Sequence, residues 1–209
     1  MTREPAFNGK VRLGPARALT GDLWGLLGSC PTAGACVDWL RRVTSPDGKP
    51  MEFGSLEKAA AAVEPSAGNP VFIPARGGDG GHVQLVGLGM HHKFGHVARA
   101  VLEGAAMSAR ELLLRMQAAG ASPSMLRAVG GATRSRFWMQ ILSDVTGLPL
   151  EVAGVQEAAA FGAAMLAGKS TGVIAADVDW PQPSLRVEPR PELHAVYDEL
   201  FRKFTEGSA

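Results

Sequence analysis

Apolar residues recur at helical spacing over residues 93–119, the longest regular stretch of the chain. The stripe consists of Val97, Val101, Ala105, Leu112 and Met116. This spacing predicts one long helix that buries a single face and ends at Gly120. Arg99, Glu103 and Arg110 fall off the stripe, so we expect their side chains to point away from the core.

Shorter patterns predict the other elements. Helices are expected at 32–43, 55–63, 135–146, 157–167 and 191–204. Strands are expected at 11–13, 16–19, 23–27, 71–74, 125–129 and 150–152. The last helix carries Leu193, Val196, Tyr197, Leu200 and Phe204 on one side. The helix over 157–167 is rich in alanine and contains Gly162, which predicts close packing against a sheet. The proline-rich residues 180–191 are interpreted as a connector. Because strands alternate with helices in the second half, we expect an α/β domain.

The composition is that of an ordinary globular protein. The chain has 209 residues, of which 46% are hydrophobic and 20% charged, and its net charge is +1. This length predicts a single domain over residues 1–209. Lysine and arginine form no cluster larger than a pair, so no nucleic-acid partner is expected. No apolar run is long enough to span a bilayer, so no membrane association is expected either.

The chain has two cysteines, Cys30 and Cys36. We interpret them as free, partly buried thiols in a reducing compartment. Residues 1–5 lack the apolar core of a secretory signal, so a cytoplasmic location is expected. Two cysteines alone cannot form a zinc site, and the five histidines show no matching ligand spacing.

A glycine pair between a predicted strand and a predicted helix is the main candidate for chemistry. Gly130 and Gly131 lack a Cβ, so the main chain there can adopt positive φ and approach a ligand closely. A helix opening directly after the turn would point its free N–H groups at whatever lies over it. This arrangement predicts a niche for an anion or a nucleotide. Ser135, at the helix start, is either a plain helix cap or a ligand contact.

A second glycine-rich stretch, residues 76–82, has two interpretations. It is either a flexible loop or a loop that holds a ligand. No Lys-Ser/Thr pair follows the glycines, so the stretch does not fit a P-loop. His91, His92 and Lys93 are interpreted as a solvated turn.

Four blocks of sequence together resemble the FGGY carbohydrate kinases, a family that includes xylulose, gluconate, ribulose and glycerol kinases. The blocks are residues 130–144 (Gly-Gly-x-x-Arg-Ser-x-x-Trp-x-Gln-Ile-x-x-Asp), 87–103, 157–167 (Glu-Ala-Ala-Ala-Phe-Gly-Ala-Ala-Met-Leu-Ala) and 32–41. Their order matches the family from about residue 20 onward, and the closing Tyr-Asp-Glu-Leu at 197–200 also fits. The first block resembles the family's adenosine motif without a gap.

The resemblance implies an RNase H-like domain of the actin/hexokinase ATPase type, with a mixed sheet flanked by helices. It implies ATP with Mg²⁺ as the cofactors, although we identify no Mg²⁺ ligand in the chain. Only the second, nucleotide-binding domain of such a kinase is recognised. The N-terminal sugar-binding domain, which carries the family's catalytic aspartate, is not. The segment 77–86 is shorter than its family counterpart, Val83 replaces a small residue, and Ala132 replaces a glycine of the adenosine motif.

The matched motifs also imply site residues. Gly130 and Gly131 would face the phosphate and ribose, and Ser135 would lie near the ribose or adenine. Gly34 and Asp38, one helical turn apart, would line the other side of the base pocket. Asp38 fits a solvated helix face equally well.

Two side chains of the adenosine-type motif and two carboxylates complete the candidates. Trp138 and Gln140 are interpreted as packing and helix-surface residues. Asp79 and Asp144 are the carboxylates nearest the motifs, but neither can be placed as a general base, and Asp144 is interpreted as structural. No catalytic residue is therefore predicted in this chain.

The function expected is the ATP-binding half of a kinase that transfers the γ-phosphate of ATP to a sugar or polyol. Arg134-Ser-x-x-Trp favours the pentulose or gluconate type. The isolated chain should not catalyse phosphorylation of a sugar. The partners expected are ATP or ADP, a sugar held by the missing domain, and either a second copy of the chain or a separate chain. The alternatives are a kinase remnant that binds nucleotide or a partner protein without catalysis, and an unrelated α/β binding protein.

Overall fold

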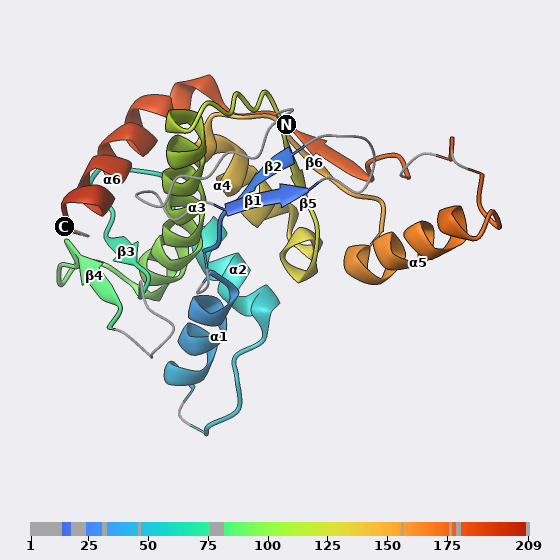
Figure 1. Cartoon of the computed structure of the whole chain (residues 1–209). Helices are drawn as coiled ribbons and strands as arrows, with labels where there is room; N and C mark the ends of the chain where they lie inside the picture. The colour runs from blue at the N-terminus through green and yellow to red at the C-terminus, as the bar shows by residue number, and fades with distance from the viewer. Residues whose placement is uncertain are drawn as a thin grey trace.

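The long helix α3 (Phe94–Ala118) is the element on which most of the others pack, as the computed structural model shows in Figure 1. The structure describes residues 14–17, 24–30, 33–45, 47–75, 82–155, 157–175, 177–178 and 181–207. The other helices are α1 (Ala33–Val43), α2 (Phe53–Ala61), α4 (Arg136–Thr146), α5 (Ala158–Ser170) and α6 (His194–Glu206), with short 3-10 helices η2 (Gly131–Arg134) and η3 (Pro191–Leu193).

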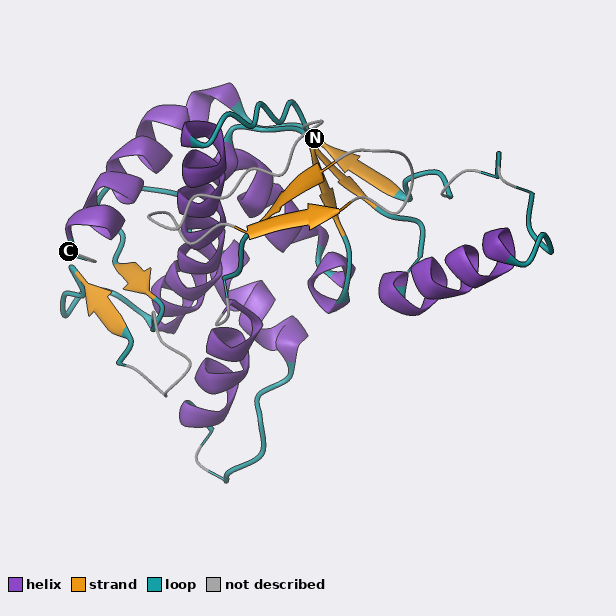
Figure 2. Ribbon diagram, in the orientation of Figure 1, coloured by secondary structure: helices purple, strands orange, loops and turns teal. Residues whose placement is uncertain are grey.

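The strands form small sheets (Figure 2). They are β1 (Gly14–Arg17), β2 (Trp24–Leu27), β3 (Val71–Ile73), β4 (Gln84–Val86), β5 (Leu126–Ala128), β6 (Leu150–Val152) and β7 (Leu185–Val187). β1 pairs with β2 and β3 with β4, both antiparallel. The sheet β5-β6-β7 is mixed, because β6 is parallel to β5 and antiparallel to β7.

The two faces of the mixed sheet differ in chemistry. Leu150 and Val152 of β6 are buried in the core. Between them, Glu151 points to the other face, where it pairs with Arg127 of β5 and Arg186 of β7, its direct neighbours in the register. This alternation follows from the two-residue period of a strand.

The middle of α3 is buried on every side, because α1, α2, α4, α6 and β3 all contact it. Gly104 lies where α3 crosses β3, and a Cβ there would collide with the carbonyl oxygen of Phe72. A glycine is therefore required at this crossing. The predicted stripe is confirmed at Val101 and Ala105, both buried.

The prediction that Arg99 and Glu103 point away from the core is wrong. Their side chains are only 3% and 2% exposed. A one-sided stripe was expected, but neighbours surround α3 in the middle and leave no solvated face. The two charges are accommodated because they pair with each other, Arg99 Nε to Glu103 Oε1 at 2.7 Å, and with Tyr197 of α6. A buried charge is tolerated only with such partners.

The prediction that the alanine-rich helix packs closely against a sheet is also wrong. α5 buries none of its residues and lies apart from the rest of the molecule in Figure 1. Its small side chains would allow another element to pack closely, but small side chains alone do not determine that an element packs there. Among the residues that the structure describes, none covers this helix enough to bury a side chain.

Element boundaries agree closely for α1, α3, α4, β3 and β6. α2 begins at Phe53, two residues before the prediction, and α5 continues to Ser170. β4 was not predicted, and the stretch expected as a connector contains β7. The expected strand at 11–13 and the glycine loop at 76–81, with Asp79, lie outside the described residues.

Candidate functional site

The glycine pair forms a turn whose backbone only glycine adopts readily. Gly130 has φ 93° and ψ −174°, a combination that costs a residue with a Cβ about 1–3 kcal/mol. The carbonyl oxygen of Gly130 accepts hydrogen bonds from the amide of Thr133, at 3.1 Å, and from its hydroxyl, at 2.6 Å. These bonds close the 3-10 helix η2. The helix was expected to open directly from the turn, but this 3-10 turn separates the glycines from α4.

Ser135 caps α4. Its hydroxyl oxygen accepts a hydrogen bond from the amide of Trp138 at 2.9 Å, and the residue is buried. The cap interpretation is therefore confirmed. A hydroxyl can still donate its own hydrogen, so capping does not by itself exclude a ligand contact.

Space is open above the turn. A Cβ added at Gly130 or at Gly131 would meet no atom within 4 Å, and Gly131 is exposed. Val129, immediately before the turn, leaves 54% of its surface exposed. The backbone at Gly130 and Gly131 therefore borders open space, and the turn is not plugged by packed side chains.

The two other predicted site residues lie on α1. Gly34 and Asp38 are both exposed, and a Cβ at Gly34 would meet nothing within 4 Å. Asp38 pairs with Arg41 on the same helix at 2.9 Å, an exposed contact of the kind that contributes little to stability. Gly130, Gly131 and Ser135 lie together in one turn. Gly34 and Asp38 belong to a separate helix, although α1 and α4 share α3 as their support.

Trp138 is a packing residue, as interpreted from the sequence. Its ring is buried, lies near Phe53 of α2, and donates its Nε1–H to the carbonyl oxygen of Leu102 on α3 at 3.2 Å. The tryptophan of the adenosine-type motif therefore fixes α4 to α3.

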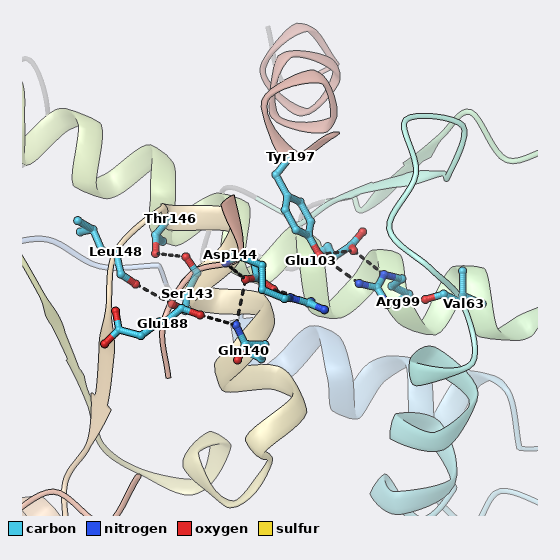
Figure 3. A network of polar contacts seen from close by, with 11 residues as sticks. Val63, Arg99, Glu103, Gln140, Ser143, Asp144, Thr146, Leu148, Glu188 and Tyr197 are labelled. Carbon is cyan, nitrogen blue, oxygen red and sulfur yellow. Dashed lines mark hydrogen bonds and ion pairs between the residues drawn. The ribbon is translucent and has the colours of Figure 1, made fainter. Parts of the chain in front are cut away.

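Asp144 has a structural environment. Its side chain is fully buried, and its two oxygens accept hydrogen bonds from the amide of Arg190 (2.8 Å), from the guanidinium of Arg190 (2.7 and 3.1 Å) and from Gln140 Nε2 (3.0 Å). Figure 3 shows the contact between Gln140 and Asp144. The hydrogen bond to Asp144 raises the pKa of Arg190. A carboxylate occupied in this way is not available as a base for a sugar hydroxyl.

Sequence reasoning missed the partners of these motif residues. Gln140 also donates to the carbonyl oxygen of Glu188, so Glu188 and Arg190 hold the polar side of α4. They lie 46 to 48 residues away in a stretch without periodicity. The one available signal was the presence of Gln140 and Asp144 themselves, two polar groups one turn apart on an otherwise amphipathic helix.

Two absences apply only to the residues described. Among them, no group of three or more histidine, cysteine, aspartate or glutamate side chains is arranged to hold a metal ion. In the same part of the chain, no helix combines the length and the apolar character needed to cross a membrane.

Comparison with known proteins gives the family of this chain. The profile of the "FGGY family of carbohydrate kinases, C-terminal domain" matches residues 1–171, so the chain belongs to this family. It is 29% identical over 178 residues to a probable L-xylulose kinase from Pasteurella multocida, covering 83% of this chain and 36% of the relative. It is 36% identical to a glycerol kinase from Leptothrix cholodnii, covering 81% and 36% respectively.

A solved structure supports the same assignment. The xylulose kinase from Rhodospirillum rubrum superposes with a TM-score of 0.78 at 28% identity, over 93% of this chain and 41% of that one. The chain thus spans well under half the length of the kinases it matches. The match also confirms the expected RNase H-like fold class.

Proposed function

We propose that this chain is the ATP-binding domain of a carbohydrate kinase and that its residues 130–135 form the adenylate-binding site. The observation that supports this most directly is the open, side-chain-free turn at Gly130 and Gly131, leading through η2 into the capped start of α4. Backbone N–H groups at such a helix start suit anionic ligands.

The proposed roles of the individual residues follow from this arrangement. Gly131 offers its backbone to the phosphate and ribose, Ser135 lies near the ribose or adenine, and Gly34 and Asp38 line the opposite side of the base from α1. Asp38 would exchange its exposed pairing with Arg41 for the ligand. Mg²⁺ would arrive with ATP and be held through the phosphates.

Phosphoryl transfer to a sugar needs a second domain that binds the sugar. Such a reaction depends on positioning and on charge stabilisation around both substrates. Asp144, the carboxylate inside the adenosine-type motif, is fully engaged by Arg190 and Gln140. We therefore propose that the sugar and its general base are supplied by a sugar-binding domain, and that the 209-residue chain binds ATP without turning over a sugar.

The substrate class is a sugar or polyol. The motif at Arg134 to Trp138 favours a pentulose or gluconate, while the matched relatives include both L-xylulose and glycerol kinases. The contacts that would decide between them belong to the sugar-binding domain rather than to the nucleotide turn.

The test is calorimetric titration of the chain with ADP, compared with the Gly131→Val variant. A side chain at Gly131 has room in the free protein, so the variant should fold normally. It would fill the space over the turn, and we expect it to weaken ADP binding by about tenfold or more, at least 1.4 kcal/mol. Gly68→Val is the matched control, because a Cβ there makes only an ordinary 3.6 Å contact with Ser66.

Besides a failure of the wild-type chain to bind ADP, two results would contradict the proposal. One is tight ADP binding that survives Gly131→Val. The other is phosphorylation of a sugar by this chain alone. Binding of ADP without turnover, even when a complete sugar-binding domain from a related kinase is added, would instead favour a nucleotide-binding module that has lost catalysis.

A further inference from the structure

The C-terminal segment, residues 185–206, contacts both helices that support the turn at residues 130–135. It comprises β7, η3 and α6 and lies beyond residue 171, where the family match ends. Its contacts are polar, and Figure 3 shows those of Tyr197 and Glu188. The Tyr197 contacts are buried, that of Glu188 is exposed and those of Arg190 are partly buried.

The first contact is with α4. Arg190 donates its backbone amide to Oδ1 of Asp144 and two guanidinium N–H groups to Oδ2, while the carbonyl oxygen of Glu188 accepts from Gln140. Because the Asp144 side chain is fully buried, Arg190 supplies the positive charge that compensates it. The polar side of α4 is therefore fixed by residues that come from the C-terminal segment.

The second contact is with α3. The Tyr197 hydroxyl accepts from Arg99 and donates to Glu103, both at 3.1 Å. Burial is the largest cause that raises the pKa of Tyr197, and the Glu103 carboxylate adds to it, so the phenol keeps the proton that it donates. Arg99 also donates to the carbonyl oxygen of Val63, just beyond α2. Tyr197 thus fixes α3 at the turn that contains Glu103.

Both contacts reach α4, the first directly at Asp144 and the second through Trp138. Leu102, the neighbour of Glu103, accepts the Trp138 indole N–H, and the Trp138 amide donates to the Ser135 cap. The hydrogen bond of Tyr197 to Glu103 and that of Trp138 to Leu102 are thus joined by the backbone of α3, which links Tyr197 to the first turn of α4. Arg190 holds the same helix two turns further along.

We propose that residues 185–206 form a clamp that sets the position of the turn, with Arg190 and Tyr197 as its positioning residues. They touch no nucleotide themselves and act through Asp144 and through Leu102–Trp138. The effect on nucleotide affinity rests on the proposed function. The effect on the geometry of the turn does not.

The experiment compares Arg190→Gln, Tyr197→Phe and a control in the full chain. Arg202→Gln is the control, because Arg202 lies on the same helix as Tyr197 and, within the described part of the chain, its guanidinium pairs with Glu199 and Glu206 of α6. The readouts are the exchange rate of the Trp138 indole hydrogen and the Gly131 amide shift by NMR, with and without ADP, and the Kd for ADP. Arg190→Lys keeps the charge without the planar fork and should restore part of the loss.

We expect both clamp variants to accelerate exchange at the Trp138 indole and to shift the Gly131 amide, and to raise the Kd for ADP about fivefold. Arg202→Gln should change none of these. If Arg190→Gln fails to fold, Tyr197→Phe carries the test, since Arg99 and Glu103 still pair directly at 2.7 Å without the hydroxyl.

The outcomes separate the two proposals. Clamp variants that lower the melting temperature but leave the indole, the amide and the Kd as in the wild type overturn the clamp. Failure of the wild-type chain to bind ADP overturns the proposed function, and the two NMR signals of the free protein then decide the clamp alone.

Discussion

Helices α4 and α5 both carry a family motif, yet one is built into the core and the other is not. α4 buries Trp138, Met139, Ile141, Ser143, Asp144 and Val145. α5 is apolar around its circumference, with Lys169 and Ser170 at its end, and buries nothing. The alternation of apolar and polar residues in α4 specifies one apolar face for the core and two polar side chains for hydrogen bonds. Its sequence therefore indicates what kind of residue packs on each side of the helix. The uniformly apolar sequence of α5 indicates that other elements should pack against it, but it does not indicate which side of the helix they should cover.

The largest expected contrast comes from shortening one apolar side chain in each helix. Ile141→Ala on α4 removes a fully buried side chain and should destabilise the chain by about 3 kcal/mol, within the range for core aliphatics. Leu166→Ala on α5, already 37% exposed, should cost about 1 kcal/mol or less. Urea unfolding followed by circular dichroism measures both. Equal losses would show that α5 is packed in solution.

Adding one methyl group to a glycine gives the next contrast. In Gly104→Ala the new Cβ would collide with the backbone of Phe72, and we expect a loss of about 2–3 kcal/mol. In Gly168→Ala on α5 the atoms nearest the new group belong to the Ile174 side chain rather than to backbone. Ile174 must shift, so we expect a smaller loss of about 1 kcal/mol or less. Thermal melts of the two variants check this. A stable Gly104→Ala protein would mean that α3 and β3 are further apart than described.

The cap of α4 gives a smaller effect. Ser135→Ala removes the acceptor of the Trp138 amide and should cost about 1 kcal/mol. Ser135→Asn, which can also cap, is the control and should recover most of that stability. The helix start of α5 has no side-chain cap at Glu157, so Glu157→Ala should leave the melting temperature nearly unchanged.

The smallest effect concerns pH at the start of α3. Partial burial lowers the pKa of His92 below its ordinary value of 6.5, with His91 and His96 as the neighbouring charges that contribute. The unfolded chain therefore binds more protons than the folded one below pH 6.5. The contribution of neutral His92 to the stability of the folded protein is therefore present above pH 6.5. It is lost as the pH falls toward the pKa that His92 has in the folded protein.

The measurement is urea unfolding between pH 7.5 and 5.5, in the wild type and in His92→Gln. The variant should show a shallower decline of stability on acidification. α5 contains only Lys169 as a titrating group, so α5 should make no contribution in this window. An identical pH profile in both proteins would show that His92 is not the source.

The parts of the fold that the sequence predicted are those with strong local periodicity. α3 and α4 fall within a residue or two of expectation, and Gly147 ends α4 in the left-handed conformation that glycine favours. β4 and β7 were missed because each has three residues with a polar one among them, Gln84 and Arg186. Such a segment becomes a strand only when a partner strand is beside it.

The candidate site divides in the same way. Gly130, Gly131 and Ser135 could be found from the sequence because they are adjacent and their backbone requirements are local. Arg190 could not be found, because its contact with Asp144 spans 46 residues. The assignment of all five predicted nucleotide contacts, Gly34 and Asp38 included, stays a prediction until ADP binding is measured.

The sequence by itself determined the family, the order of the α-helices and the bend at Gly130, since these follow from motif order, periodicity and the absence of a Cβ. Only the tertiary structure decided that Arg99 and Glu103 are buried, that Asp144 is hydrogen-bonded on both oxygens and that the described residues fully bury no side chain of α5. The physical reason is that burial and pairing belong to sets of residues from distant segments. The sequence of one segment indicates which kind of neighbour it needs, but only the folded chain determines which residues become its neighbours.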